Sequence, residues 1–189
     1  MFRFLLMLFL LSVLIQAKVQ ITDSVDTYPE GSPEHLTTLA LKYTTEENWK
    51  AYAEILDSDD LKIVKSIFNY LVSKDTTDEI LKEFNFEGSK DSFYNVSQIE
   101  FFPMFMSFIY KIQPQLSSAL GSISSKVIGT VPEGNLSHVL TRKKVESAGI
   151  NYEQLEIITV IHKDNKIFIK MKDNIKAFAE QLKKLLGNE

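Results

Sequence analysis

The sequence KVIGTVPEGNLSHVL, residues 126–140, contains two runs rich in β-branched residues on either side of the turn-forming residues 132–135. This composition is typical of two strands joined by a turn. Similar runs follow at residues 154–162 and 167–171, and the dipeptide Asp164-Asn165 between them suits a two-residue hairpin, because both residues tolerate a positive φ. The C-terminal half therefore predicts four antiparallel strands, at residues 126–131, 136–145, 154–162 and 167–171.

The same turns predict how the strands pair. A two-residue hairpin sets the partners of His162 in the last strand, and a loop that pairs Val145 with Tyr152 places His138 opposite Thr159. Side chains alternate strictly between the two faces of a sheet. We therefore expect the two histidines to point to opposite faces, with His162 on the more apolar one.

The N-terminal half shows the periodicity of helices instead. Ser32-Pro33 predicts a helix start, with a serine N-cap and a proline at the first helical position. Thr44 and Glu47 form a capping-box pair, which predicts the start of a second helix that carries Trp49. The segment 99–112 is dense in Phe and Met and predicts a helix buried on most sides; the alternative is a ligand-lining or membrane-touching helix.

Helices first, a sheet next and a closing helix from Asp173 indicate an α+β fold. We expect the N-terminal helices to pack on the four-stranded antiparallel sheet. The predicted organisation is a polar leader arm at residues 18–31 and a single α+β domain at residues 32–189. That domain is expected to be helical over 32–113 and to hold the sheet and final helix over 122–186.

The N-terminus has the pattern of a secretory signal peptide at residues 1–17. A short basic start with Arg3 precedes the run 4–15, which is apolar except for Ser12, and Ala17 supplies the small residue at the exit. The apolar run is shorter than the roughly 20 residues that a stable membrane span requires. The sequence therefore predicts a secreted or periplasmic protein; the alternative is a buried helix or a short anchor.

Composition excludes several classes of protein. Without Arg3, 20 basic residues face 25 acidic ones, and no basic stripe is present to bind the phosphates of a nucleic acid. The absence of cysteine excludes a disulfide framework, a thiol nucleophile and cysteine-bound zinc. It also favours a bacterial export route, in which the glycosylation sequons at Asn95 and Asn135 would not be used.

Residues 127–140, 155–163 and 166–171 together resemble a group of uncharacterised exported bacterial proteins. In that group, a strand, a Glu-Gly turn and a strand with a histidine near its start precede a central strand and a closing hairpin. The layout is similar to cystatin-like and nuclear-transport-factor-2-like domains, which implies a curved antiparallel sheet that wraps helices. Where the group carries tyrosine-arginine after the histidine strand, this chain has Thr141-Arg142, so only Arg142 matches. The resemblance implies a fold and brings no activity with it.

No catalytic motif of the serine-hydrolase, phosphate-loop or zinc-protease kinds is present. His138 and His162 are candidate bases, with Glu156 as a candidate carboxylate, but a base also requires a positioned partner. The acidic run of Asp57, Asp59 and Asp60 lies between two predicted helices, where helix capping explains it without a metal. We therefore expect no cofactor and no metal.

The predicted function is that of an exported, non-catalytic binding or interaction domain. Phe105 and Phe108 of the aromatic helix, and Arg142 through the resemblance, are the candidates to line a ligand site. The expected partner is a protein or a small apolar ligand, with no nucleic acid and no stable membrane span after signal cleavage. Two alternatives stay open: a small hydrolase or isomerase that uses His138 or His162 with a carboxylate such as Glu156, and a structural partner in an envelope assembly.

Overall fold

The computed structural model describes residues 19–21, 27–112, 122–147 and 150–186. Its elements, in chain order, are β1 (Val19–Ile21), α2 (Pro33–Thr45), α3 (Trp49–Ile55), α4 (Ser58–Lys74), α5 (Glu79–Glu83), α6 (Lys90–Asn95), α7 (Gln98–Ile112), β2 (Ser122–Glu133), β3 (Leu136–Ser147), β4 (Ile150–Lys163), β5 (Lys166–Ile169) and α9 (Asp173–Leu186). The predicted signal peptide at residues 1–17 lies outside the described residues. Within them, no helix is long and apolar enough to cross a membrane.

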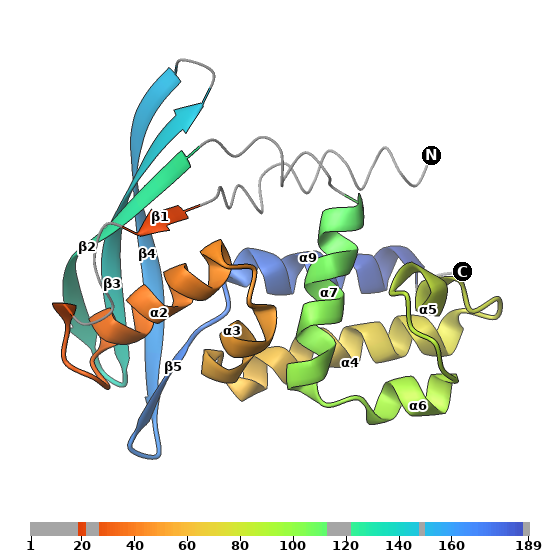
Figure 1. Ribbon diagram of the computed structural model, residues 1–189. Helices are drawn as coiled ribbons and strands as arrows, with labels where there is room; N and C mark the ends of the chain where they lie inside the picture. Colours follow the sequence, from red (N-terminus) through yellow and green to blue (C-terminus); the bar gives the residue numbers. More distant parts are fainter. Residues whose placement is uncertain (1–18, 22–26, 113–121, 148–149, 187–189) are drawn as a thin grey trace.

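The fold is α+β, as predicted, with helices packed on a sheet (Figure 1). The four predicted antiparallel strands are present, and β1 adds a fifth strand that is parallel to its neighbour β2. Strands β2 to β5 pair in sequence order and antiparallel. Helix α2 contacts all five strands of the sheet, whereas α9 packs mainly on α4. The sheet therefore forms one layer at one end of the molecule, and most of the helices lie beyond α2 (Figure 1).

The leader arm is partly structured, which corrects the prediction for residues 18–31. Val19–Ile21 form strand β1, which pairs in parallel with residues 123–125 of β2. Strand β2 begins at Ser122, four residues before its predicted start, and this extension offers an edge with which the short strand can pair. Tyr28 also packs against the hydrophobic core.

The hairpin register is the one that the turn predicts. Asp164 and Asn165 adopt φ values of 49° and 60°, and the flanking strands pair His162 with Ile167. Strands β3 and β4 pair His138 with Thr159. In β3, Ser137, Val139, Thr141 and Lys143 are buried while Arg142 and Lys144 are exposed, so the odd-numbered residues face the helices.

One predicted helix start and several strand ends were placed incorrectly; strand β4, for example, begins at Ile150, four residues before its predicted start. Thr44 belongs to the end of α2, where its hydroxyl donates to the Ala40 carbonyl, and the side chain of Asn48 caps α3 instead. The N-cap of α4 is Asp57, whose carboxylate accepts from the Asp59 N–H. Strand β5 ends at Ile169, because there the chain turns toward the start of α4: the Asp57 N–H donates to the Ile169 carbonyl.

One hydrophobic core runs through the molecule. Trp49 and the buried face of α7 belong to it, as predicted, together with Val139 and Val160 of the sheet. The ring of Phe105 contacts those of Phe68, Phe101 and Phe102 at centroid distances between 5.4 and 6.1 Å. Helix α7 is therefore a central buried helix.

Candidate functional site: a pocket between sheet and helices

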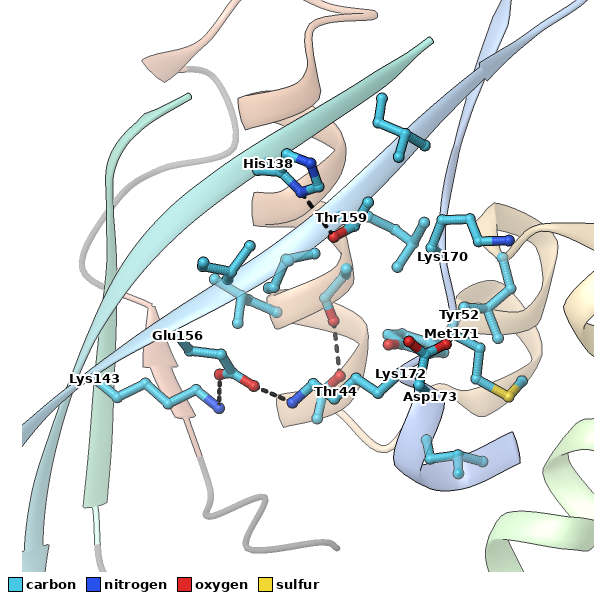
Figure 2. A pocket seen from close by; sticks show the side chains of 18 of the residues that line it. Thr44, Tyr52, His138, Lys143, Glu156, Thr159, Lys170, Met171, Lys172 and Asp173 are labelled. Atoms are coloured by element: carbon cyan, nitrogen blue, oxygen red, sulfur yellow. Dashed lines mark hydrogen bonds and ion pairs between the residues drawn. The ribbon is translucent and has the colours of Figure 1, made fainter. Parts of the chain in front are cut away.

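A pocket of about 460 Å³ lies between the sheet and the helices (Figure 2). Strand β5 pairs only with Val160–Lys163, so the preceding part of β4 has an open edge on that side, and the pocket reaches residues of both sheet faces there. Volumes between roughly 300 and 1,000 Å³ are typical of small-molecule sites.

Most of the wall is apolar. Helix α2 supplies Ala40 and Leu41, and the chain from β5 into α9 supplies Ile169, Met171 and Ile175. Further apolar lining residues are Leu56, Phe102, Leu136, Ile157 and Ile158. Such a wall favours the aliphatic or aromatic body of a ligand, because burial of apolar surface is the main driving force for binding.

Three charged side chains meet at the pocket. Glu156 of β4 forms ion pairs with Lys143 of β3 and with Lys172, which follows β5 (Figure 2). Lys143 and Glu156 share the face that packs on the helices, because Thr141, two residues before Lys143, is the partner of Glu156. We call these three residues the Lys143–Glu156–Lys172 cluster.

Burial and charge act against each other in this cluster. Burial raises the pKa of Glu156, but the two lysines more than offset this effect, so the carboxyl titrates below its usual range. Burial also lowers the pKa of Lys143, and its attraction to Glu156 only partly opposes that shift. The carboxylate is therefore held ionised between its two partners.

Tyr52 of α3 adds a hydroxyl group to the pocket lining. Burial, and then the negative charge of Glu156, raise the pKa of Tyr52 to about 12. The group is thus a neutral phenol near pH 7, which can donate a hydrogen bond.

The two histidines point to opposite faces of the sheet, as predicted. His138 contacts the Thr159 hydroxyl through Nδ1 at 3.1 Å and the Glu133 carboxylate through Nε2 at 2.7 Å, and it lines the pocket. His162 is exposed, and its Nε2 lies 2.9 Å from the Ser137 hydroxyl.

Neither histidine is brought to Glu156. His138 pairs with Thr159, three residues from Glu156, so His138 and Glu156 occupy opposite faces. His162 shares the face of Glu156 but lies six residues away along β4, a separation of about 20 Å at the usual rise of a strand. The pairing of a histidine with Glu156 is therefore not assembled, whereas His138 does contact another carboxylate, that of Glu133.

The acidic run has a different role from the one that capping alone suggests. Asp57 does cap α4, but it and Asp60 are also buried and contact lysines that come from the end of the chain. Lys163 pairs with Asp57 and Asp59, Lys170 with Asp57 and Asp60, and Lys176 with Asp60 and Asp173. Among the described residues, no group of three or more potential ligands is arranged to hold a metal ion.

The residues predicted to line a ligand site lie elsewhere. Phe105 is buried in the aromatic core, and Phe108 packs against that core and stacks on Phe84 at 4.9 Å. Arg142 is exposed and pairs with Glu153 at 3.6 Å. Of the aromatic helix, it is Phe102 that reaches the pocket.

Sequence reasoning missed Lys143 and Lys172 as site residues. The predicted strand register does contain the signal for Lys143, because it places that residue and Glu156 on one face as diagonal neighbours. Lys172 and Tyr52 carry no such signal, since each lies in a segment that approaches the sheet only in the folded chain.

Comparisons of the chain with protein-family models, with curated proteins and with solved structures find no match. The resemblance of residues 127–140, 155–163 and 166–171 to exported bacterial proteins with cystatin-like or nuclear-transport-factor-2-like domains stays a prediction. Any functional conclusion therefore has to be drawn from the pocket itself.

Proposed function

We propose that this protein is a non-catalytic binding domain that holds a small, largely apolar ligand in the pocket between sheet and helices. The observation that carries the proposal is a pocket of ligand size, about 460 Å³, with a mainly apolar wall and the Lys143–Glu156–Lys172 cluster among its polar groups. That combination is characteristic of small-molecule sites.

The contacts of the described titratable residues at the pocket favour a binding role, because neither histidine lies beside Glu156. General acid–base catalysis requires a base with a positioned partner within hydrogen-bond reach. The only histidine that lines this pocket, His138, contacts Glu133 and Thr159, and Glu156 contacts two lysines. His138 thus has a carboxylate and a hydroxyl group as partners, but the Glu133 side chain is 74% exposed, which favours a surface contact over an acid–base site closed to water.

Energy transfer from Trp49 tests the proposal. Trp49 is the single tryptophan of the chain, and its ring lies 6.0 Å from that of Tyr52 at the pocket. Dansyl-labelled undecanoic acid, added to the purified protein, should give saturable emission when Trp49 is excited. Emission that rises linearly without saturation would contradict the proposal.

Two adjacent threonines supply a matched pair of variants. Thr44 and Thr45 both donate to the backbone carbonyl four residues earlier, at 2.8 and 2.9 Å, but only Thr44 lines the pocket. Thr44→Phe should obstruct the pocket and weaken probe binding. Thr45→Phe should leave the affinity for the probe close to the wild-type value. Equal effects of the two substitutions would place the probe outside the pocket.

We also propose that the protein is exported after removal of residues 1–17. The support is the basic, apolar and small-residue pattern that ends at Ala17. Cleavage there would leave the residues of β1 at the start of the mature chain. N-terminal sequencing of the exported protein should find a start within a few residues of Lys18; a membrane-bound chain that retains Met1 would contradict the proposal.

A further inference from the structure

The Lys143–Glu156–Lys172 cluster carries more positive than negative charge. Two ammonium groups share one carboxylate, so the formal charge of the cluster is positive by one unit when all three groups are ionised. The side chains of Lys143 and Glu156 are only 10% and 14% exposed, and that of Lys172 is 40% exposed. The surplus charge therefore lies in a partly buried place, where water screens it less than on an open surface.

The other acidic and basic side chains of the pocket lining already have partners. Lys170 pairs with Asp57 and Asp60, and Asp173 pairs with Lys176. His138 contacts Glu133. No other carboxylate among the described lining residues pairs with Lys143 or Lys172, so the surplus charge of the cluster is not neutralised by the wall.

We infer that the ligand of this pocket is an amphipathic carboxylate, whose anionic group binds between Lys143 and Lys172 while its apolar body occupies the wall formed by α2 and the β5–α9 segment. The inference rests on the proposed binding function and names the class of ligand. A second carboxylate would balance the charge of the cluster, and hydrogen bonds between ionised partners are stronger than those between neutral groups.

Glu156 has a positioning role in this arrangement. Each of its two oxygen atoms contacts a different lysine, so the carboxylate holds the two ammonium groups on one side of the pocket. Its own negative charge offsets one of the two positive charges. The remaining single positive charge makes the cluster suited to an anion with a single charge. A neutral ligand of the same shape would gain only the apolar contacts.

Competition between two ligands of matched shape tests the inference. Dodecanoic acid and dodecanol should each displace dansyl-labelled undecanoic acid from the purified protein, and the acid should do so at a concentration about tenfold lower, because hydrogen bonds to charged groups are stronger. Equal potency of the acid and the alcohol would overturn the inference and leave the binding function intact. If the probe itself gave no saturable signal, the proposed function would fail instead.

Variants of the lysines separate charge recognition from structural support. Lys172→Met, at the more exposed of the two lysines, should weaken the binding of dodecanoic acid about tenfold and leave the binding of dodecanol unchanged. Lys143→Met should change the two affinities in the same direction. Lys166→Met, at the exposed tip of the β4–β5 hairpin, is the control and should change neither. The inference would be overturned if Lys172→Met kept a wild-type circular dichroism spectrum and its affinities for the acid and the alcohol either fell equally or did not change.

Discussion

The Lys163 ammonium group lies 2.6 Å from the carboxylate of Asp57, a residue 106 positions earlier in the chain. The contact joins the tip of the last hairpin to the first residue before α4, and Lys170 approaches the same carboxylate at 3.2 Å. Asp57 is 1% exposed, so its charge depends on these partners. The start of α4 and the end of the sheet are therefore held together by charge as well as by the Asp57–Ile169 backbone bond.

Asp57→Asn should lower the free energy of unfolding by about 3 kcal/mol, since it leaves the lysines facing a neutral group. We take the lower end of the range for a broken buried pair because the lysine side chains are about one-third exposed. Urea denaturation measures the change. Asp59→Asn, at an exposed partner of the same Lys163, is the control and should have a much smaller effect; equal losses would refute the role of burial.

The same carboxylate makes the stability of the protein depend on pH in acid. Burial raises the pKa of Asp57, but the contacts from Lys163, the Asp59 N–H and Lys170 more than offset it, so the pKa in the folded state is below the usual value. The stabilisation is therefore fully present above the unfolded pKa of roughly 4 and is lost as the pH falls through the folded pKa. In unfolding experiments, the difference in stability between wild type and Asp57→Asn should shrink below about pH 4. A difference that stays constant down to pH 2 would contradict this linkage.

Phe105→Ala should destabilise the protein by about 3–5 kcal/mol, because it removes a ring that is 2% exposed from the centre of the aromatic core. Thermal or urea unfolding measures the loss. Ile99→Ala, at a residue of the same helix that is 37% exposed, is the matched surface control and should cost much less. An unchanged unfolding midpoint for Phe105→Ala would mean that this face of α7 is not buried.

The hairpin turn should discriminate between residues that accept a positive φ and residues that do not. Asn165 has a φ of 60°, so Asn165→Val should lower the free energy of unfolding by about 1–2 kcal/mol. Asn165→Gly should be close to neutral, since glycine adopts this conformation without steric cost. If valine and glycine were tolerated equally, the turn would have a different conformation in solution.

The sequence alone was sufficient for the order of elements and for much of the sheet. Asp164-Asn165 determined the register of the last hairpin, because the φ preferences of two adjacent residues act locally. The alternation of the strands then placed His138 and His162 on opposite faces. The apolar face of α7 was readable for the same reason, since helical periodicity depends only on neighbours three or four residues apart.

Local patterns were insufficient where several residues could perform the same task. Thr44 and Asn48 both qualify as caps, and the packing of α2 on the sheet left Thr44 inside the helix. The leader arm contains too short an apolar pattern to predict β1, which forms because β2 extends far enough to provide its edge.

The sequence by itself determined that this chain forms an α+β fold with two histidines that cannot cooperate. Only the tertiary structure decided that Lys172 would meet Glu156 and that Lys163 would meet Asp57. The physical reason is that an ion pair has no sequence signature: any lysine can neutralise any carboxylate, and the path of the chain between them selects the pair. The pocket has the same origin, because it exists where β5 leaves the edge of β4 to reach the start of α4.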